Sequence, residues 1–128
     1  MPSLAATSPG ETLASLLLPK AKEGKLVCAV ELWGPELDYR FRRAGVFDRV
    51  VFFPQAIARH PGWYHESEVP EAAMRAEAMD LSVSRTRRPS LFVLPRGSRA
   101  TEALIVALRP YRARLLFSNP LVDVAELP

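Results

Sequence analysis

The chain has 128 residues, 48% of them hydrophobic and 24% charged, which is enough for one domain with a buried core and excludes a composition typical of disorder. Its apolar runs are too short to cross a bilayer, and residues 1–11 lack the basic and apolar regions of a secretory signal peptide. The single cysteine excludes an internal disulfide and fits a reducing compartment, so we expect one cytoplasmic domain over residues 1–128, without membrane contact.

The net charge of +3 is unevenly distributed along the chain. Residues 66–80 carry five acidic side chains against one arginine, whereas residues 81–118 carry eight arginines against one glutamate. Such a basic stretch can face a phosphate, a nucleic acid or an acidic partner, or it can be a solvated surface balanced by the acidic segment. The 12 prolines and the scarcity of Asn and Gln are typical of a heat-adapted protein, although a GC-rich genome also favours proline and arginine.

Two helices and two strands are predicted in the first half of the chain. A serine followed by Pro-Gly-Glu is typical of a helix start, and Pro19 is expected to end this helix. Gly34 and Pro35 are expected to break the first strand, and Pro54 the second. The predicted helices cover residues 8–18 and 36–44, and the predicted strands cover residues 26–33 and 49–53.

The same alternation continues after an irregular stretch and a helix that opens at Pro70. In the last predicted helix, Leu104, Ile105 and Leu108 are expected to share one buried face. The predicted helices cover residues 70–81 and 98–108, the predicted strands cover residues 90–94 and 114–117, and the tail either adds a short strand or packs as coil.

Strands and helices at these spacings imply parallel pairing through right-handed crossovers. We therefore expect an α/β fold, a small three-layer Rossmann-like domain with a mainly parallel sheet of about four to five strands. Ligands of such sheets bind beyond the carboxyl ends of the strands, where this sequence gathers polar and small residues, although turns need such residues in any case. The predicted ligand-binding residues are Glu31, Gly34, Arg75, Arg96, Gly97, Ser98, Arg99, Ser118 and Asn119.

The turn at residues 94–98, LPRGS, is the main candidate at this edge. A helix that begins near Ser98 leaves backbone N–H groups and the positive end of its dipole pointing outward. A phosphate or carboxylate can dock there, with Gly97 allowing close approach and Arg96 or Arg99 adding charge. Neither nucleotide motif, GxGxxG or GxxxxGK[ST], is present. The alternative is that the serine only caps the helix and that the arginines are solvated.

The order strand, LPRGS, helix resembles the PGGxGTxxE segment of the LOG/lysine-decarboxylase-like family of Rossmann proteins, which includes nucleoside monophosphate phosphoribohydrolases and the molybdenum cofactor carrier. Residues 50–55 (VVFFPQ) resemble that family's strand ending in proline, and residues 75–79 (RAEAM) resemble its RKxxM helix. The resemblance extends over residues 12–119 and implies phosphate contacts at Arg75, Gly97 and Ser98.

The sequence departs from this family's pattern where the family has its catalytic residue. Arg96 and Arg99 stand in place of two glycines, and Ala103 stands in place of the catalytic glutamate. Glu102 is one position away, which turns it about 100° around the helix. The resemblance therefore implies binding rather than phosphoribohydrolase activity, and we expect no catalytic residue and no cofactor.

Two histidines, two aromatic residues and a glutamate form another candidate group. His60 and His65 with Glu66 can bind zinc if they converge, but their spacing on an irregular loop matches no zinc motif, and no metal is expected. Trp63 and Tyr64 can cover the sheet edge or stack on a base.

Cys28 and Glu31 lie in the first predicted strand. Cys28 is expected to be a small buried residue rather than a nucleophile. Glu31 is either a general acid–base with a raised pKa or a structural carboxylate paired with an arginine from residues 85–99.

The sequence as a whole predicts a homodimeric domain that binds an anionic or phosphorylated small molecule, such as a nucleotide, at the strand carboxyl ends without catalysis. Two alternatives stay open. One is a protein-interaction or dimerisation module that uses the acidic and basic segments or the apolar helix at residues 100–108. The other is nucleic-acid binding through the arginines of residues 81–118, for which no RRM, KH, zinc-finger or helix-turn-helix signature is present.

Overall fold

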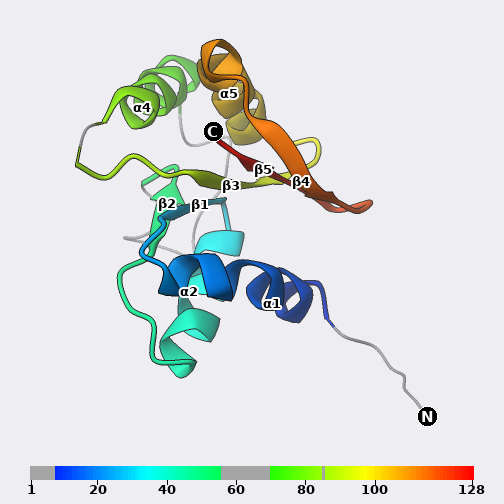
Figure 1. Cartoon of the computed structure of the whole chain (residues 1–128). Coiled ribbons are helices and arrows are strands. Elements are labelled where there is room, and N and C mark those ends of the chain that lie inside the picture. The colour runs from blue at the N-terminus through cyan, green and yellow to red at the C-terminus, as the bar shows by residue number, and fades with distance from the viewer. Residues whose placement is uncertain (1–7, 56–69, 85) are drawn as a thin grey trace.

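The computed structural model describes residues 8–55, 70–84 and 86–128. Within these residues, helices and strands alternate up to the last two strands, as Figure 1 shows. The elements are α1 (Pro9–Lys22), β1 (Val27–Val30), α2 (Trp33–Arg43), β2 (Val50–Phe53), α4 (Glu71–Val83), β3 (Leu91–Pro95), α5 (Arg99–Leu108), a 3-10 helix (Arg109–Tyr111), β4 (Arg114–Ser118) and β5 (Val122–Glu126).

The strands form one sheet in the order β2-β1-β3-β5-β4. β1 pairs in parallel with β2 and with β3, as predicted from the alternation of strands and helices. β5 pairs antiparallel with β3 and with β4, so the sheet is mixed, and the expected parallel pairing holds for β2, β1 and β3 but not for β5. The physical reason is the connection between β4 and β5, which is only residues 119–121 long and permits a hairpin but not a crossover.

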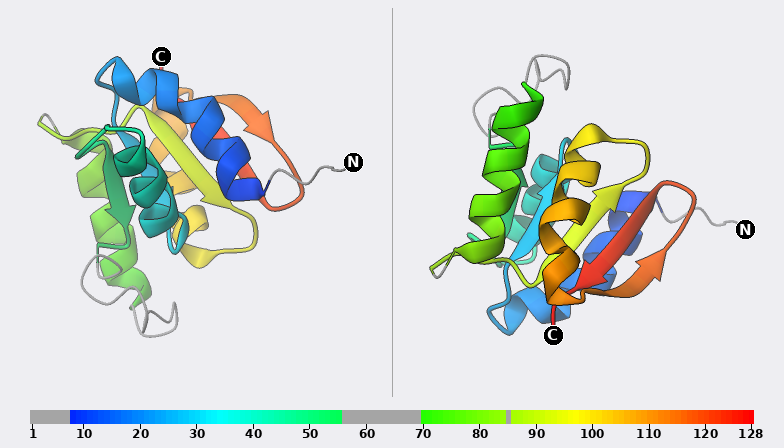
Figure 2. Two further views of the ribbon diagram at one scale, coloured as in Figure 1. Left: turned by 90° about the horizontal axis from the view of Figure 1, so that it is seen from below. Right: turned by 90° about the horizontal axis from the view of Figure 1, so that it is seen from above.

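Helices cover both faces of this sheet, which gives three layers (Figures 1 and 2). α1 and α2 pack on one face around a buried cluster that includes Leu13 and Val93. α4 and α5 pack on the other face around a second buried cluster that includes Met74 and Phe92. Cys28 belongs to the second cluster and is fully buried, as predicted.

Two expected helix boundaries are wrong. Pro19 does not end α1, which continues to Lys22 because Ala21 is buried against the sheet and holds the last turn in place. Gly34 and Pro35 do not separate β1 from the next helix but lie in the first turn of α2. A proline is tolerated there, because the first N–H groups of a helix have no intrahelical partner.

α5 begins where the sequence predicts. Ser98 is its N-cap, and the Ser98 Oγ accepts hydrogen bonds from two backbone N–H groups of the first turn, at 3.1 and 3.4 Å. Leu104 and Leu108 are buried as expected, but Ile105 is 42% exposed. The difference arises because Ile105 is turned about 100° from Leu104 around the helix axis, and the sheet covers only one stripe.

Candidate functional site

The edge of the sheet at which the ligand is predicted contains the ends of three strands. Glu31 follows β1 and Arg96 follows β3. Ser118 is the last residue of β4, and Asn119 follows it. β4 runs in the same direction as β3, because both are antiparallel to β5. The structure therefore places these four predicted residues along one edge.

Hydrogen bonds and an ion pair hold Arg96 against the hairpin of β4 and β5. Its Nε donates a hydrogen bond to the carbonyl of Asn119 at 2.9 Å, and its Nη2 donates to Ser118 Oγ at 2.7 Å and pairs with Asp123 at 2.8 Å. The Asn119 side chain accepts hydrogen bonds from two backbone N–H groups of the same turn, both at 2.8 Å. These contacts close the hairpin and balance the charge of Arg96, so they define a structural role for this cluster.

Two backbone N–H groups at the start of α5 are already hydrogen-bonded to the N-cap residue of the helix. Ser98 Oγ takes two N–H groups that a docked anion would otherwise use, and Ser98 itself is buried. Gly97 is exposed and has φ of 76°, a left-handed conformation that favours glycine. The glycine is thus explained by the turn between β3 and α5.

Glu31 and Gly34 shape the turn between β1 and α2. Glu31 has φ of 57°, and its backbone N–H donates to the carbonyl of Phe53 at 2.7 Å. Gly34 is buried, and a β-carbon at this position would lie 2.8 Å from Cδ1 of Phe52, closer than carbon atoms pack. Gly34 therefore permits the close approach of α2 to β2.

Arg75 and Arg99, the remaining predicted residues, line one groove between α4 and α5. The groove has a volume of about 290 Å³ and is also lined by Glu71 and Glu102, so these four side chains balance in charge. Arg75 pairs with Glu71 at 2.8 Å. Ala103 lines the same groove.

Four basic side chains gather at the opposite edge of the sheet, around one carboxylate. A hollow of about 430 Å³, which we call the basic pocket, is lined by Lys20, Lys25, Arg112, Arg114, Glu126, Leu127 and Pro128. These residues come from the end of α1, the segment before β1, the start of β4 with the residues just before it, and the end of β5 with the two residues after it. None of them is among the residues predicted from the sequence as ligand contacts.

Glu126 is the centre of the basic pocket. Its side chain is 6% exposed; Oε1 accepts from Arg114 at 2.9 Å, and Oε2 accepts from Lys20 at 3.1 Å and from Lys25 at 3.5 Å. The hydrogen bonds from Arg114 and Lys20 are the main reason that the pKa of Glu126 falls from its ordinary value of 4.5 to about 2. Because both ammonium groups contact one oxygen atom, they lie within a few ångströms of each other and repel.

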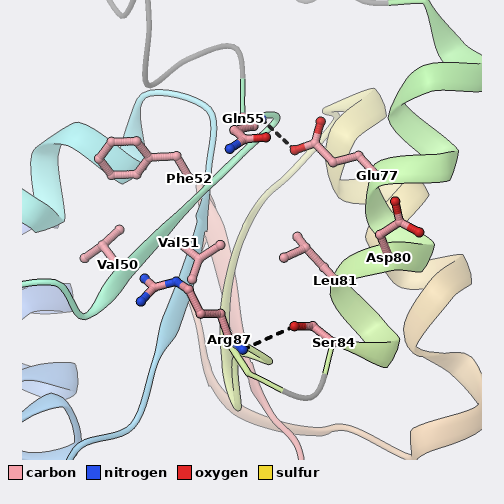
Figure 3. A pocket seen from close by; sticks show the side chains of 9 residues that line it. All are labelled: Val50, Val51, Phe52, Gln55, Glu77, Asp80, Leu81, Ser84 and Arg87. Atoms are coloured by element: carbon pink, nitrogen blue, oxygen red, sulfur yellow. Dashed lines mark hydrogen bonds between the residues drawn. The ribbon is translucent and has the colours of Figure 1, made fainter.

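A second hollow of about 430 Å³, which we call the β2 groove, runs beside β2 under α4 (Figure 3). It is lined by Val50, Val51, Phe52, Gln55, Glu77, Asp80, Leu81, Ser84 and Arg87. Glu77 lies at the Gln55 end and accepts a hydrogen bond from the backbone N–H of Gln55 at 2.6 Å, whereas Arg87 lies at the other end beside Ser84 (Figure 3). Burial raises the pKa of Glu77, against the lowering effect of this hydrogen bond.

Cys28 does not supply a nucleophile in this arrangement. Burial raises the pKa of its thiol far above the ordinary value, and the charge of Glu77 adds to the rise. The thiolate is the reactive form, so this residue is inert in the folded protein.

Several predicted features fall outside the described residues. His60, His65 and Glu66, for which no metal is expected, and Trp63 and Tyr64 all lie in residues 56–69. Within the described part of the chain, no group of three or more His, Cys, Asp or Glu side chains could hold a metal ion, and no helix is long and apolar enough to span a membrane.

The arginines of residues 81–118 are divided among several environments. Arg87 lines the β2 groove, Arg88 lies over the ring of Tyr111 at 4.6 Å from its centroid, and Arg96 is held by Asp123.

Comparison with known proteins gives no further guide, because no family model, no curated protein and no solved structure matches this chain. The resemblance to the LOG-like family therefore stays a prediction.

Proposed function

We propose that this domain binds a small molecule with at least two negative charges, such as a phosphate ester or a polycarboxylate, in the basic pocket. The observation that carries the proposal is the placement of Lys20, Lys25 and Arg114 on the single buried carboxylate of Glu126. One acceptor is shared by three cationic donors, and the pocket beside them is open and large enough for a small organic anion.

The charge balance of the pocket favours an anion. Lys20, Lys25, Arg112 and Arg114 carry four positive charges against one on Glu126. A free carboxylate at Pro128 would still leave an excess of two positive charges. Each ammonium retains N–H donors beyond the one that it directs at Glu126, and a guanidinium offers five. A phosphate oxygen could take these donors and reduce the repulsion between the two lysines.

The carboxyl edge of the strands supports the same proposal less well. At this edge the positive charge of Arg96 is already balanced by Asp123, and in the groove between α4 and α5 the predicted contact Arg75 is paired with Glu71. The proposed ligand is of the class that the sequence predicts, but the proposed site lies at the opposite edge of the sheet. We also propose that β1, β2 and β3 with α2 and α4 form a Rossmann-like half, to which the β4–β5 hairpin is added.

Thermal unfolding in the presence of inorganic phosphate, a nucleoside triphosphate and citrate tests this function. We expect at least one of these anions to raise the melting temperature, because a ligand that binds only the folded state stabilises it. Arg112→Asn should weaken this effect without unfolding the protein, since residue 112 has φ of 53°, which Asn tolerates well, and Arg112 makes no salt bridge to Glu126 within the described residues.

The matched control is Arg109→Gln, which removes one exposed arginine outside the basic pocket. Sodium chloride at equal ionic strength separates binding from general screening. The proposal is wrong if none of the three anions stabilises the protein beyond the chloride control, or if both variants reduce the effect equally.

A further inference from the structure

We propose that two copies of this chain associate through the outer edge of β2, so that their sheets join into one continuous sheet across a two-fold axis. β2 is one of the two edge strands of the sheet, and no described residue pairs with its outer edge. The proposal does not depend on the basic pocket, which is formed by other elements at the amino ends of β1 and β3.

The backbone of β2 offers a defined set of hydrogen-bonding groups. The carbonyls of Arg49 and Phe53 accept from β1, at 2.8 and 2.7 Å. Backbone groups alternate between the two edges of a strand, so Val50 and Phe52 direct their N–H and C=O groups outward. In an antiparallel pair centred on Val51, Val50 of each copy would exchange two hydrogen bonds with Phe52 of the other.

The two edges of the sheet differ in their protection against such pairing. β4, the other edge strand, begins with Arg114 and contains a register shift between Leu115 and Phe117. Charged residues and bulges are the usual means by which an edge strand avoids pairing. β2 reads VVFF, with neither a charge nor an irregularity in its register with β1. Its composition favours pairing.

The β2 groove has a charge polarity that matches a second copy of itself. Glu77 and Asp80 lie toward its Gln55 end, and Arg87 lies at its Val50 end (Figure 3). A two-fold axis through Val51 reverses the groove, so the arginine of each copy would face the acidic end of the other. An isologous interface requires such self-complementarity, and here it would form two equivalent ionic contacts.

Apolar surface in the groove supports the same occupant. Val51 points to the α4 side of the sheet, and Leu81 of α4 faces the groove above it (Figure 3). In the paired arrangement, the two Val51 side chains would meet at the axis beneath the two Leu81 side chains. This contact would remove from water the apolar part of both grooves.

A charge exchange between Asp80 and Arg87 tests this interface. We expect the wild-type chain to sediment as a dimer at micromolar concentrations. Asp80→Arg and Arg87→Asp should each weaken dimerisation about tenfold or more, since each changes two symmetry-related contacts. The double variant should restore it. Both residues are exposed, so neither variant threatens the fold, and Arg109→Glu serves as the control at an exposed arginine outside the groove.

Amide hydrogen exchange gives an independent measurement on the same samples. The amides of Val50 and Phe52 should exchange more slowly as protein concentration rises, whereas those of β4 should not change. A monomer at all accessible concentrations overturns the proposal. So does a dimer that neither single variant weakens, or one whose concentration-dependent protection lies in β4 or on α5.

Discussion

Glu126→Gln is predicted to destabilise the protein by about 2 kcal/mol at neutral pH. Glutamine preserves the size of the side chain and removes its charge. The Glu126 side chain is only 6% exposed and accepts hydrogen bonds from three cationic side chains. One hydrogen bond to a buried charged group contributes about 1.5–3 kcal/mol to stability. Arg114 and Lys25 are 73% and 41% exposed, so their contributions are small and the total stays near that of one strong bond.

The size of this loss should depend on pH in a defined direction. The pKa of Glu126 is about 2 in the folded protein, below the ordinary value of 4.5 that it regains on unfolding. The stabilisation by the carboxylate is therefore complete above pH 4.5 and disappears as the pH falls from 4.5 to about 2. The difference in unfolding free energy between the two proteins should close over this interval.

Urea unfolding at pH 7 and at pH 2.5, followed by circular dichroism, measures both quantities. A difference that is equal at the two pH values would refute the ionised bridge. A difference below about 0.5 kcal/mol at pH 7 would mean that the three cations contribute no more than ordinary surface pairs.

The same substitution should strengthen anion binding. Removing one negative charge from the basic pocket leaves the four cations unopposed by Glu126, and a unit charge at about 5 Å in a watery environment changes the energy of a bound charge by about 1 kcal/mol. We expect roughly fivefold tighter binding of phosphate to Glu126→Gln, measured by calorimetry at neutral pH. Opposite signs for stability and affinity distinguish a ligand site from a purely structural ion-pair cluster.

Three further substitutions or treatments test individual contacts. Gly34→Ala should lower stability by about 1–3 kcal/mol in chemical unfolding, because its β-carbon would meet the Phe52 ring at 2.8 Å; an unchanged midpoint would mean that the ring moves freely. Arg96→Ala should cost about 1–2 kcal/mol and leave anion affinity unchanged, and a loss of affinity would return the ligand to the carboxyl edge. Cys28 should react with a thiol reagent only at the rate of unfolding, and rapid modification of the folded protein would contradict its burial.

The elements that the sequence predicts well are those with strong local signals. β1 and β2 are continuous apolar runs that are covered on both faces of the sheet, and such runs are recognisable without tertiary information. Ser98 is identified as a cap because its side chain acts on the next turn of the chain. The predicted end of α1 at Pro19 is wrong because the packing of Ala21 outweighs the local tendency of proline to end a helix.

The order of the strands depends on interactions that periodicity does not contain. The three-residue connection between β4 and β5, Asn-Pro-Leu, is a local signal for a hairpin that the sequence itself contains. Which strand of the hairpin then pairs with β3 is a separate question, since both carry apolar residues and one or two charges. The choice of β5 as the inner strand is decided by burial, because most of β5 is buried whereas β4 is largely exposed.

That choice also explains why the basic pocket escapes prediction. When β5 lies between β3 and β4, Glu126 is placed beside Leu91 on one side and Arg114 on the other, at the edge where α1 ends. Lys20 and Glu126 are 106 residues apart in the chain, and no motif spacing connects them. The local signal in the sequence is that two acids, Asp123 and Glu126, lie in a mostly apolar tail, and each requires a polar or cationic partner if the tail is buried. The proposed anion site is therefore a consequence of strand order, and a variant that displaced β5 from the sheet would lose the site together with the fold.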